Sequence, residues 1–209
     1  MIDYRVYLVT DDPSRYAGNW LDNVRAAVEG GVTCVQYRDT ESDEKTQYGR
    51  ILALRDAIGK VPIIVNNSAA LAKAVKAEGV HVGQGDMPPD EVRAIVGPRC
   101  EIGLSITEVG QVAAIDRRVV DAIGIGPVFD ARKTKADAAE AMGPNGLRAI
   151  VERIPDIANC AIGGITLENG AEVVAAGAKG LAVVSAFSKS ENPYEVAKKF
   201  SLLFDRCGQ

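Results

Sequence analysis

Three stretches of the chain, AVEGGVTCV (27–35), AVKAEGVHV (74–82) and VAAGAKGLAV (174–183), share one pattern, in which a helical segment ends, a glycine follows and a β-branched apolar run begins. Glycine readily ends a helix in the left-handed conformation before a short connection to a strand. A pattern of this kind that recurs along a chain indicates a repeated strand and helix unit. The three stretches therefore predict an α/β fold built from successive βα units.

Eight short apolar runs are the expected strands of these units. They are RVYLVT (5–10), VTCVQYR (32–38), VPIIVN (61–66), GVHVG (79–83), EIGLS (101–105), DAIGIGP (121–127), NCAIGG (159–164) and GLAVVS (180–185). Their continuous apolar character is typical of parallel strands that are buried on both faces. Eight such units predict a single (β/α)8 TIM barrel over residues 1–209. The alternative, an open doubly wound sheet, would carry GxGxxG after its first strand, where this chain has TDDPSRY (10–16).

Amphipathic segments of helix length separate the runs. They cover residues 19–29, 43–58, 68–77, 88–96, 107–115, 143–153, 166–176 and 192–204. Pro88-Pro89 is a typical helix start, and Thr107 and Thr166 are expected to cap two other helices.

The composition indicates a soluble protein. The chain has 209 residues, of which 47% are hydrophobic, and its net charge is −4. This charge argues against nucleic acid and anionic membranes as partners, and no apolar run approaches the roughly 20 residues of a membrane span. The N-terminus does not resemble a secretory signal. The four cysteines, at 34, 100, 160 and 207, form no CxxC motif, so we expect free thiols and a cytoplasmic location.

In a (β/α)8 barrel the reactive residues stand at the C-terminal ends of the strands. Gln36 and Arg38 are two residues apart on the second run, so they share a face, and we expect that face to point into the barrel mouth. The planar guanidinium of Arg38 suits a phosphate. A structural ion pair with a neighbouring acid is the alternative.

Two neighbouring strand ends predict a phosphate site. Gly163-Gly164 end the seventh run and Val184-Ser185 end the eighth, where many such barrels bind phosphate through backbone N–H groups. The alternative is that the glycines only permit a tight turn. Asp86, in GQGDMPPD (83–90), is a candidate ligand for a divalent cation, with helix capping as its competing role.

The segment DARKTKADAAEAM (130–142) is longer than an ordinary loop and carries the cations Arg132, Lys133 and Lys135. It is predicted to be a lid that closes over a pyrophosphate, with a solvated run of charges as the alternative. His81, the sole histidine, lies between apolar neighbours and is interpreted as a packed strand residue rather than a catalytic base.

Taken in order, several motifs resemble those of the thiamine-phosphate synthase family. They are VQYRD (35–39), IIVNN (63–67), GVHVGQGDMP (79–88), GLSIT (103–107), IGIGPVF (123–129) with TKADA (134–138), AIGGIT (161–166) and GLAVVSA (180–186). The resemblance runs from about Val6 to Phe200. It implies a (β/α)8 barrel that joins 4-amino-2-methyl-5-(diphosphooxymethyl)pyrimidine to 4-methyl-5-(2-phosphooxyethyl)thiazole with Mg2+, giving thiamine phosphate and pyrophosphate. It also implies that both substrates are small phosphorylated molecules.

The resemblance implies a role for each matching residue. Gln36 and Ser105 match contacts to the pyrimidine, and Asp86 matches a magnesium ligand, with Asn67 beside it. Arg38, Asn66 and Lys135 match contacts to the diphosphate. Thr134 matches a thiazole contact, and the site for the thiazole phosphate is matched by Gly164, Val184 and Ser185. Arg38, Ser105 and Lys135 are the expected catalytic residues, and Arg132 is an expected substrate contact.

Three positions depart from the family pattern. Asn67 replaces an Asp, which removes one metal carboxylate. Thr40 replaces a Lys, for which Lys45 is a candidate substitute, and Arg132 stands where a Thr is usual. The added lid cations, Arg132 and Lys133, are a hypothetical compensation for Thr40.

Other functions stay open at this point. A thiazole tautomerase should have a catalytic His after Ser105, where this chain has Ile106. Asn67 and Thr40 leave open a non-catalytic barrel that binds a phosphorylated thiazole or pyrimidine. Another phosphate-binding barrel enzyme, such as an isomerase, would need an acid or base pair at the strand ends, and none is apparent. The sequence does not fix the oligomeric state, and a homodimer is one option.

Overall fold

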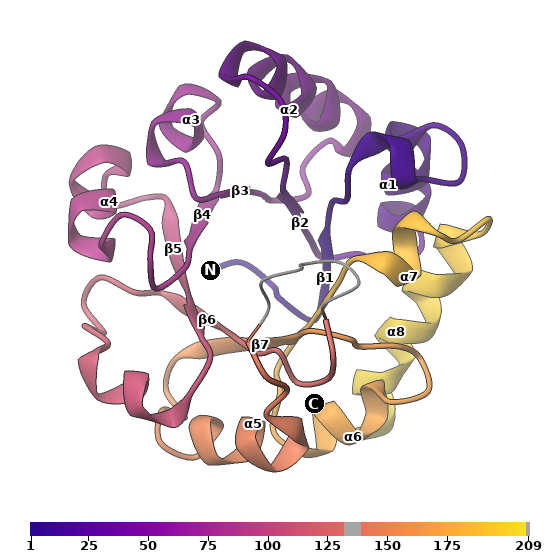
Figure 1. Cartoon of the computed structure of the whole chain (residues 1–209). Helices are drawn as coiled ribbons and strands as arrows, with labels where there is room; N and C mark the ends of the chain where they lie inside the picture. Colours follow the sequence, from indigo (N-terminus) through magenta and orange to yellow (C-terminus); the bar gives the residue numbers. More distant parts are fainter. Residues whose placement is uncertain (132–138, 208–209) are drawn as a thin grey trace.

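The computed structural model describes residues 1–131 and 139–207. Eight parallel strands form a closed barrel in which each strand pairs with the next in sequence and the last pairs with the first, as Figure 1 shows along the barrel axis. The strands are β1 (Val6–Val9), β2 (Cys34–Tyr37), β3 (Ile63–Asn66), β4 (Gly79–Val82), β5 (Glu101–Ile106), β6 (Ala122–Ile125), β7 (Ala158–Ile162) and β8 (Leu181–Val183). The predicted (β/α)8 barrel is confirmed.

Helices surround the barrel (Figure 1). The α-helices are α1 (Trp20–Glu29), α2 (Glu44–Ile58), α3 (Ala69–Ala74), α4 (Pro89–Val96), α5 (Gly143–Val151), α6 (Gly170–Ala175), α7 (Ser185–Ser188) and α8 (Pro193–Cys207), and the 3-10 helices are η1 (Pro13–Arg15) and η2 (Val109–Ala114). Side chains accept hydrogen bonds at several helix starts, as Asn19 does from Leu21 N, Asp43 from Thr46 N and Ser68 from Leu71 N. These bonds satisfy backbone donors that a helix leaves free.

Some predictions about the helices were wrong. Residues 107–115 form the 3-10 helix η2 instead of an α-helix, and neither Thr107 nor Thr166 is an N-cap. At η2 the side chain of Gln111 bonds to both the backbone N and the hydroxyl of Thr107, so that hydroxyl is already engaged. At α6 the side chain of Asn169 accepts the backbone N–H of Thr166, which delays the helix to Gly170.

The repeated helix–glycine–strand pattern has its expected conformation at two of its three sites. Gly31 and Gly177 have φ values of 117° and 106°, which are left-handed and favour glycine. In the second stretch the left-handed residue is Lys76, with φ 53°, and Gly79 begins β4. A Cβ on Gly79 would lie 3.1 Å from Ile64 Cγ1, so this glycine is needed for packing rather than for the turn.

The apolar residues form two layers. The larger lies between the barrel and the helices, and the smaller fills the barrel interior with residues such as Tyr7, Cys34 and Cys160. Residues 1–4 extend this interior layer at the N-terminal end of the barrel. There the buried Ile2 donates its backbone N–H to Glu101 Oε1 at 2.7 Å, and the buried Tyr4 donates its hydroxyl to Glu101 Oε2 at 3.1 Å.

Cys34, Cys100 and Cys160 are free and buried, as predicted. The side chain of Cys207 lies outside the described residues. Within the ranges that the structure describes, no helix has both the length and the apolarity that a membrane crossing needs.

Candidate active site

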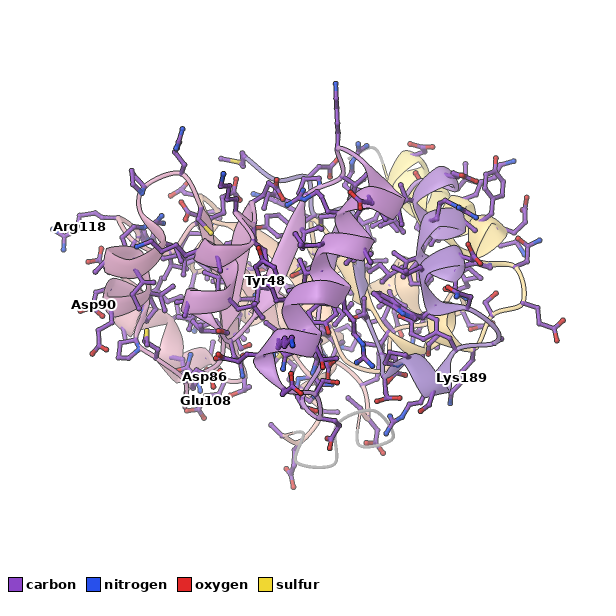
Figure 2. All side chains as sticks on the ribbon, turned by 90° about the horizontal axis from the view of Figure 1, so that it is seen from above. Tyr48, Asp86, Asp90, Glu108, Arg118 and Lys189 are labelled. Carbon is purple, nitrogen blue, oxygen red and sulfur yellow. The ribbon has the colours of Figure 1, made fainter. Side chains whose placement is uncertain are left out.

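A cavity of about 400 Å³ opens among the C-terminal ends of the strands. Each of the eight strands, or the loop that follows it, contributes at least one lining residue. The predicted residues among them are Gln36, Arg38, Asn66, Ser105, Gly164, Val184 and Ser185. Figure 2 shows the labelled residues Asp86, Glu108 and Lys189 toward one end of the molecule, because each follows a strand on its C-terminal side. The structure therefore brings seven of the predicted substrate residues into one cavity.

Gln36 lies on β2 and faces the barrel interior. It is buried, and its Nε2 donates to the hydroxyl of Tyr7 on β1 at 2.6 Å. Burial raises the pKa of Tyr7 well above its usual value, so the phenol stays protonated. The bond fixes the Gln36 amide at the cavity wall, and no described residue donates a hydrogen bond to its oxygen.

Arg38 follows Gln36 on the same face of the chain, and Tyr37 between them packs in the helix-side layer. Among the described residues, the Arg38 guanidinium has neither an ion-pair partner nor a hydrogen-bond acceptor. The adjacent acid, Asp39, pairs instead with Arg50 of α2 at 2.7 Å. Thus the alternative of a structural ion pair for Arg38 is not realised within the described part of the chain.

Asp39 is held firmly in that pair. Burial raises the pKa of its carboxyl, but bonds from Ser42 N, the Tyr37 hydroxyl and Glu41 N outweigh burial and bring the pKa well below its usual value. The Tyr37 hydroxyl donates at 2.8 Å and Ser42 N at 3.0 Å. The charge of Asp39 is therefore neutralised locally and does not compete for Arg38.

His81 and Ser105 form a polar pair on the cavity wall. His81 Nε2 lies 3.0 Å from Ser105 Oγ, and both residues line the cavity. Burial lowers the pKa of His81 to about 4, although the Asp86 carboxylate acts in the opposite direction. The imidazole is thus neutral at physiological pH, and it can orient the Ser105 hydroxyl by accepting or donating one hydrogen bond.

The position of His81 depends on two glycines of the neighbouring strands. A Cβ on Gly103 of β5 would meet His81 Nδ1, and a Cβ on Gly124 of β6 would lie 2.9 Å from His81 Cε1. Gly103 is the register partner of His81, and Gly124 that of Ser105. His81 was interpreted from the sequence as a packed strand residue; it is packed, but its ring faces the cavity and contacts a predicted site residue.

Asp86 and Asn67 lie side by side at the rim of the barrel. Asn67 Nδ2 donates to Asp86 Oδ1 at 3.2 Å, and Gly83 N donates to Asp86 Oδ2 at 2.7 Å. Asn67 has φ 62°, a left-handed conformation that Asn adopts more readily than most residues. The competing role for Asp86 is not realised, since α4 has Pro88 at its N-cap and no side-chain cap bond.

This pair fits Mg2+ by donor type. One carboxylate and one amide oxygen are hard oxygen donors, and Mg2+ in proteins is commonly held by one or two carboxylates together with substrate phosphates and water. No group of three or more His, Cys, Asp or Glu side chains suited to a metal occurs in residues 1–131 and 139–205. The residues present therefore suit a cation that arrives with a phosphorylated substrate better than a resident metal.

Gly163 and Gly164 after β7 form another part of the wall. Their φ values are 102° and 62°, and a Cβ on Gly164 would lie 2.8 Å from Phe129 Cβ. The glycines thus permit the turn and also a close approach to the loop after β6. In the described part of the chain, the backbone N–H groups of Gly164 and Ile165 donate to no protein acceptor. They are available to an anion.

The loop after β8 adds a further donor to this wall. Val184 and Ser185 line the cavity, and Ser185 begins the short helix α7. The first N–H groups of a helix have no acceptor within it. The backbone around Gly164 and Ser185 therefore presents several donors to one part of the cavity.

Residues 132–138 of the predicted lid lie outside the described residues, and they include Arg132, Lys133, Thr134 and Lys135. Their predicted roles stay predictions. Thr40 and Lys45, the position of the missing Lys and its candidate substitute, are described and do not line the cavity.

Sequence reasoning missed several residues of the wall, namely Tyr7, Val9, Thr107 and Cys160. Tyr7 could have been found from the sequence, because side chains alternate along a strand and Tyr7 therefore shares a face with Val9 at the end of the first strand. Burial raises the pKa of the Cys160 thiol to about 12, so this thiol stays protonated at physiological pH.

Comparison with known proteins decides the family. The family model described as thiamine monophosphate synthase matches residues 6–187. The chain belongs to this family. Thiamine-phosphate synthases from Albidiferax ferrireducens and Chloroflexus aurantiacus are 39% and 38% identical to it, over 96% and 97% of this chain and 92% and 94% of theirs.

A solved structure of the same family agrees over nearly the whole chain. The thiamine phosphate pyrophosphorylase from Pyrococcus furiosus has a TM-score of 0.87 and 29% identity, covering 98% of this chain and 96% of its own. The resemblance inferred from the sequence motifs is confirmed, and the family's barrel is the one described above.

Proposed function

We propose that the protein catalyses the reaction for which the family is named, the joining of 4-amino-2-methyl-5-(diphosphooxymethyl)pyrimidine to 4-methyl-5-(2-phosphooxyethyl)thiazole. The products are thiamine phosphate and pyrophosphate. One observation carries the assignment. A single cavity holds Arg38, whose guanidinium has no partner among the described residues, and a separate set of backbone donors at Gly164 and Ile165 that bond to no acceptor in the same part of the chain. Two anion sites in one cavity suit two phosphorylated substrates.

The diphosphate binds at Arg38 and Asn66. The Arg38 guanidinium offers a planar fork of donors that suits phosphate oxygens. Asn66 ends β3, next to β2 in the barrel, and its side chain amide lines the same cavity. Lys135 is proposed as the third diphosphate contact, with Arg132 beside it, on the grounds of the family motif alone.

Mg2+ is proposed to bind at Asp86 and Asn67, where it would offset negative charge on the diphosphate leaving group. Asp86 supplies a full carboxylate and Asn67 an amide oxygen. Because Asn67 currently donates its Nδ2 to Asp86, the two side chains already lie within contact of one another.

The pyrimidine binds where neutral polar groups line the wall. Gln36 is fixed by Tyr7, and Ser105 is fixed by His81, so each presents one oriented group. A neutral His81 suits this role, because a positive imidazolium would oppose a developing cation on the pyrimidine. The thiazole phosphate binds at Gly164, Val184 and Ser185, with Thr134 contacting the thiazole.

The reaction then breaks one bond and forms one. The C–O bond between the pyrimidine methylene and the diphosphate breaks, and its electron pair leaves with pyrophosphate. The lone pair of the thiazole nitrogen forms the new C–N bond to that methylene carbon. Arg38 and Lys135 stabilise the departing charge, and the cavity wall holds the two rings within reach of each other.

Pyrophosphate release tests this proposal, with thiamine phosphate detected directly in the same sample. The purified protein is given both substrates with and without Mg2+. Stoichiometric formation of both products, dependent on Mg2+ and lost in Arg38→Ala, supports the synthase. Binding of either substrate without product would instead support a non-catalytic barrel, and conversion of a thiazole phosphate alone would support a tautomerase.

The tautomerase is disfavoured by Ile106, which occupies the position of the expected catalytic histidine. It is fully buried in the helix-side layer and does not line the cavity.

We propose a cytoplasmic location, supported by the three buried free thiols.

A further inference from the structure

The helix that carries Ser185 is too short to fix its own position. α7 spans only Ser185–Ser188, and Figure 1 shows it between α1 and α8. Its backbone bonds run from Phe187 N and Ser188 N to Val184 O, from Lys189 N to Ser185 O and from Ser190 N to Phe187 O. A single turn is not stable alone, because helix formation needs a costly nucleus. Something else must hold α7 against the cavity.

The segment between β1 and α1 supplies that support through Ser188. The hydroxyl of Ser188 donates to Asp11 Oδ2 at 3.1 Å, and Ala17 N donates to Ser188 O at 3.0 Å. Ser188 and Asp11 are both buried. One of these bonds holds the end of α7 through the side chain of Ser188, and the other holds it through the backbone carbonyl of Ser188.

Asn23 of α1 provides a second attachment. Its Nδ2 donates to Phe187 O at 3.2 Å and to Ser190 O at 3.3 Å. Phe187 is in the last turn of α7, where its carbonyl also accepts the backbone N–H of Ser190 at 3.1 Å, and Ser190 lies two residues beyond the helix. Asn23 Oδ1 is buried and has no hydrogen-bond partner in the described residues. A buried oxygen without a partner lowers the stability of the fold, and the two bonds of Nδ2 offset part of this cost.

Asp11 is itself held in place. Its Oδ1 accepts from Asp12 N at 2.9 Å, and its own backbone N donates to the hydroxyl of the buried Tyr16 at 3.1 Å. Arg15 lies 3.5 Å from the same carboxylate. These contacts hold the Asp11 carboxylate in one position, where it accepts the hydrogen bond of Ser188.

We infer that Asp11 and Asn23 are positioning residues for the phosphate end of the thiazole substrate, an inference that rests on the proposed function. Neither residue lines the cavity. They act through α7, by holding Ser185 and its backbone at the wall formed with Gly164. Loss of either attachment lets α7 shift, and the site for the thiazole phosphate loses its geometry while Arg38 on β2 keeps its own.

The test compares two small changes with a matched control. Ser188→Ala removes the bond to Asp11, and Asn23→Leu removes the two bonds to α7. Asp12→Asn is the control, because Asp12 lies in the same segment and, within residues 1–131 and 139–207, its side chain accepts hydrogen bonds from Ser14 alone. If the Asn23→Leu variant does not fold, Ser188→Ala alone still tests the inference, because it removes the other attachment of α7.

The readouts are the KM for each substrate and, by calorimetry, the Kd for the thiazole phosphate and for its dephosphorylated alcohol. We expect KM and Kd for the thiazole phosphate to rise about tenfold in both variants, since small displacements of binding groups have effects of this size or larger. The KM for the pyrimidine diphosphate and the Kd for the alcohol should stay within twofold of wild type, and the control should match wild type throughout.

Equal changes for both substrates, or for phosphate and alcohol, would show a general loss of structure and overturn the inference. No change in either variant would overturn it as well. A wild-type protein that forms no product would refute the proposed function instead, and the calorimetric comparison would still decide whether Asp11 and Asn23 act on the phosphate.

Discussion

Arg50 Nη1 lies 2.7 Å from Asp39 Oδ2, so the acid that directly follows Arg38 is neutralised by a residue outside the cavity. Replacing Arg50 by Met removes the positive charge beside Asp39, while Tyr37 and Ser42 N still hold its carboxylate, so the charge of Asp39 then acts on Arg38. We expect the KM for the pyrimidine diphosphate to rise about tenfold, the equivalent of roughly 1.4 kcal/mol. The KM for the thiazole phosphate should not change.

Arg55→Met is the matched control for this prediction. Arg55 is on the same helix and pairs with Glu78 at 2.8 Å, away from the cavity. Steady-state kinetics of the two variants side by side provide the check. A rise in KM of equal size in both would mean that any lost ion pair on α2 has this effect, and the specific role of Arg50 would be wrong.

Metal affinity should respond to the amide at position 67. Asn67→Asp adds a second carboxylate beside Asp86, and Asp tolerates the left-handed backbone found there. We expect the Mg2+ concentration for half-maximal activity to fall about tenfold, the equivalent of roughly 1.4 kcal/mol of binding. Asp86→Asn should raise it by at least as much.

Asp90→Asn serves as the control for the metal titration, because Asp90 is in the first turn of α4 and Figure 2 shows it apart from Asp86. Its titration curve should overlay that of the wild type. If Asn67→Asp left the Mg2+ requirement unchanged, the metal would have to bind elsewhere.

The stability of the fold should fall in acid because of His81. Burial lowers its folded pKa to about 4, whereas an unfolded histidine titrates near 6.5. Between these values the unfolded chain binds a proton that the folded protein does not, so the free energy of unfolding falls as pH drops through this window. The full difference is up to about 3 kcal/mol.

Urea denaturation at pH 7.5, 6, 5 and 4 measures this effect, with pH values chosen to bracket the window. His81→Asn should flatten the dependence across it, although carboxylates will still contribute below about pH 5. An unaltered slope between pH 7.5 and 5 in the variant would contradict the assignment to His81.

Gly164→Ala should impair both stability and the thiazole site. The new Cβ would lie 2.8 Å from Phe129 Cβ and 2.9 Å from Asp130 O, at a φ of 62°. Gly97→Ala is a close control, because Gly97 has φ 77° and a Cβ there meets nothing within 4 Å. Both should lose about 1–3 kcal/mol, because each has a positive φ that residues other than glycine rarely adopt.

Only Gly164→Ala should lose more than that, by about 1–3 kcal/mol of overpacking, and only it should raise the KM for the thiazole phosphate. Urea denaturation and steady-state kinetics separate the two effects. The prediction fails if the two alanine variants behave alike in both measurements.

The barrel and many cavity residues could be predicted because they depend on short sequence periods. Gln36 and Arg38 share a face since side chains alternate along a strand, and Tyr37 between them turns outward as that rule requires. The strand ends of a (β/α)8 barrel meet at one rim, so Asn66 and Ser105 could be placed there without coordinates.

The contacts between strands could not be predicted in the same way. His81 appears in the sequence as a core residue because its neighbours are apolar, and its place in the cavity depends on Gly103 and Gly124, which make room for its ring. The attachment of Ser188 to Asp11 joins residues 177 positions apart. It exists only because the barrel closes and brings the last strand beside the first.

The residues before β1 close the N-terminal end of the barrel interior. Ile2 and Tyr4 are hydrogen-bonded to Glu101 and fill the N-terminal end of the barrel, whereas the cavity lies at the C-terminal ends of the strands. We therefore expect both substrates and both products to enter and leave at the end of the barrel where the strands terminate, and to bind and depart in a fixed order.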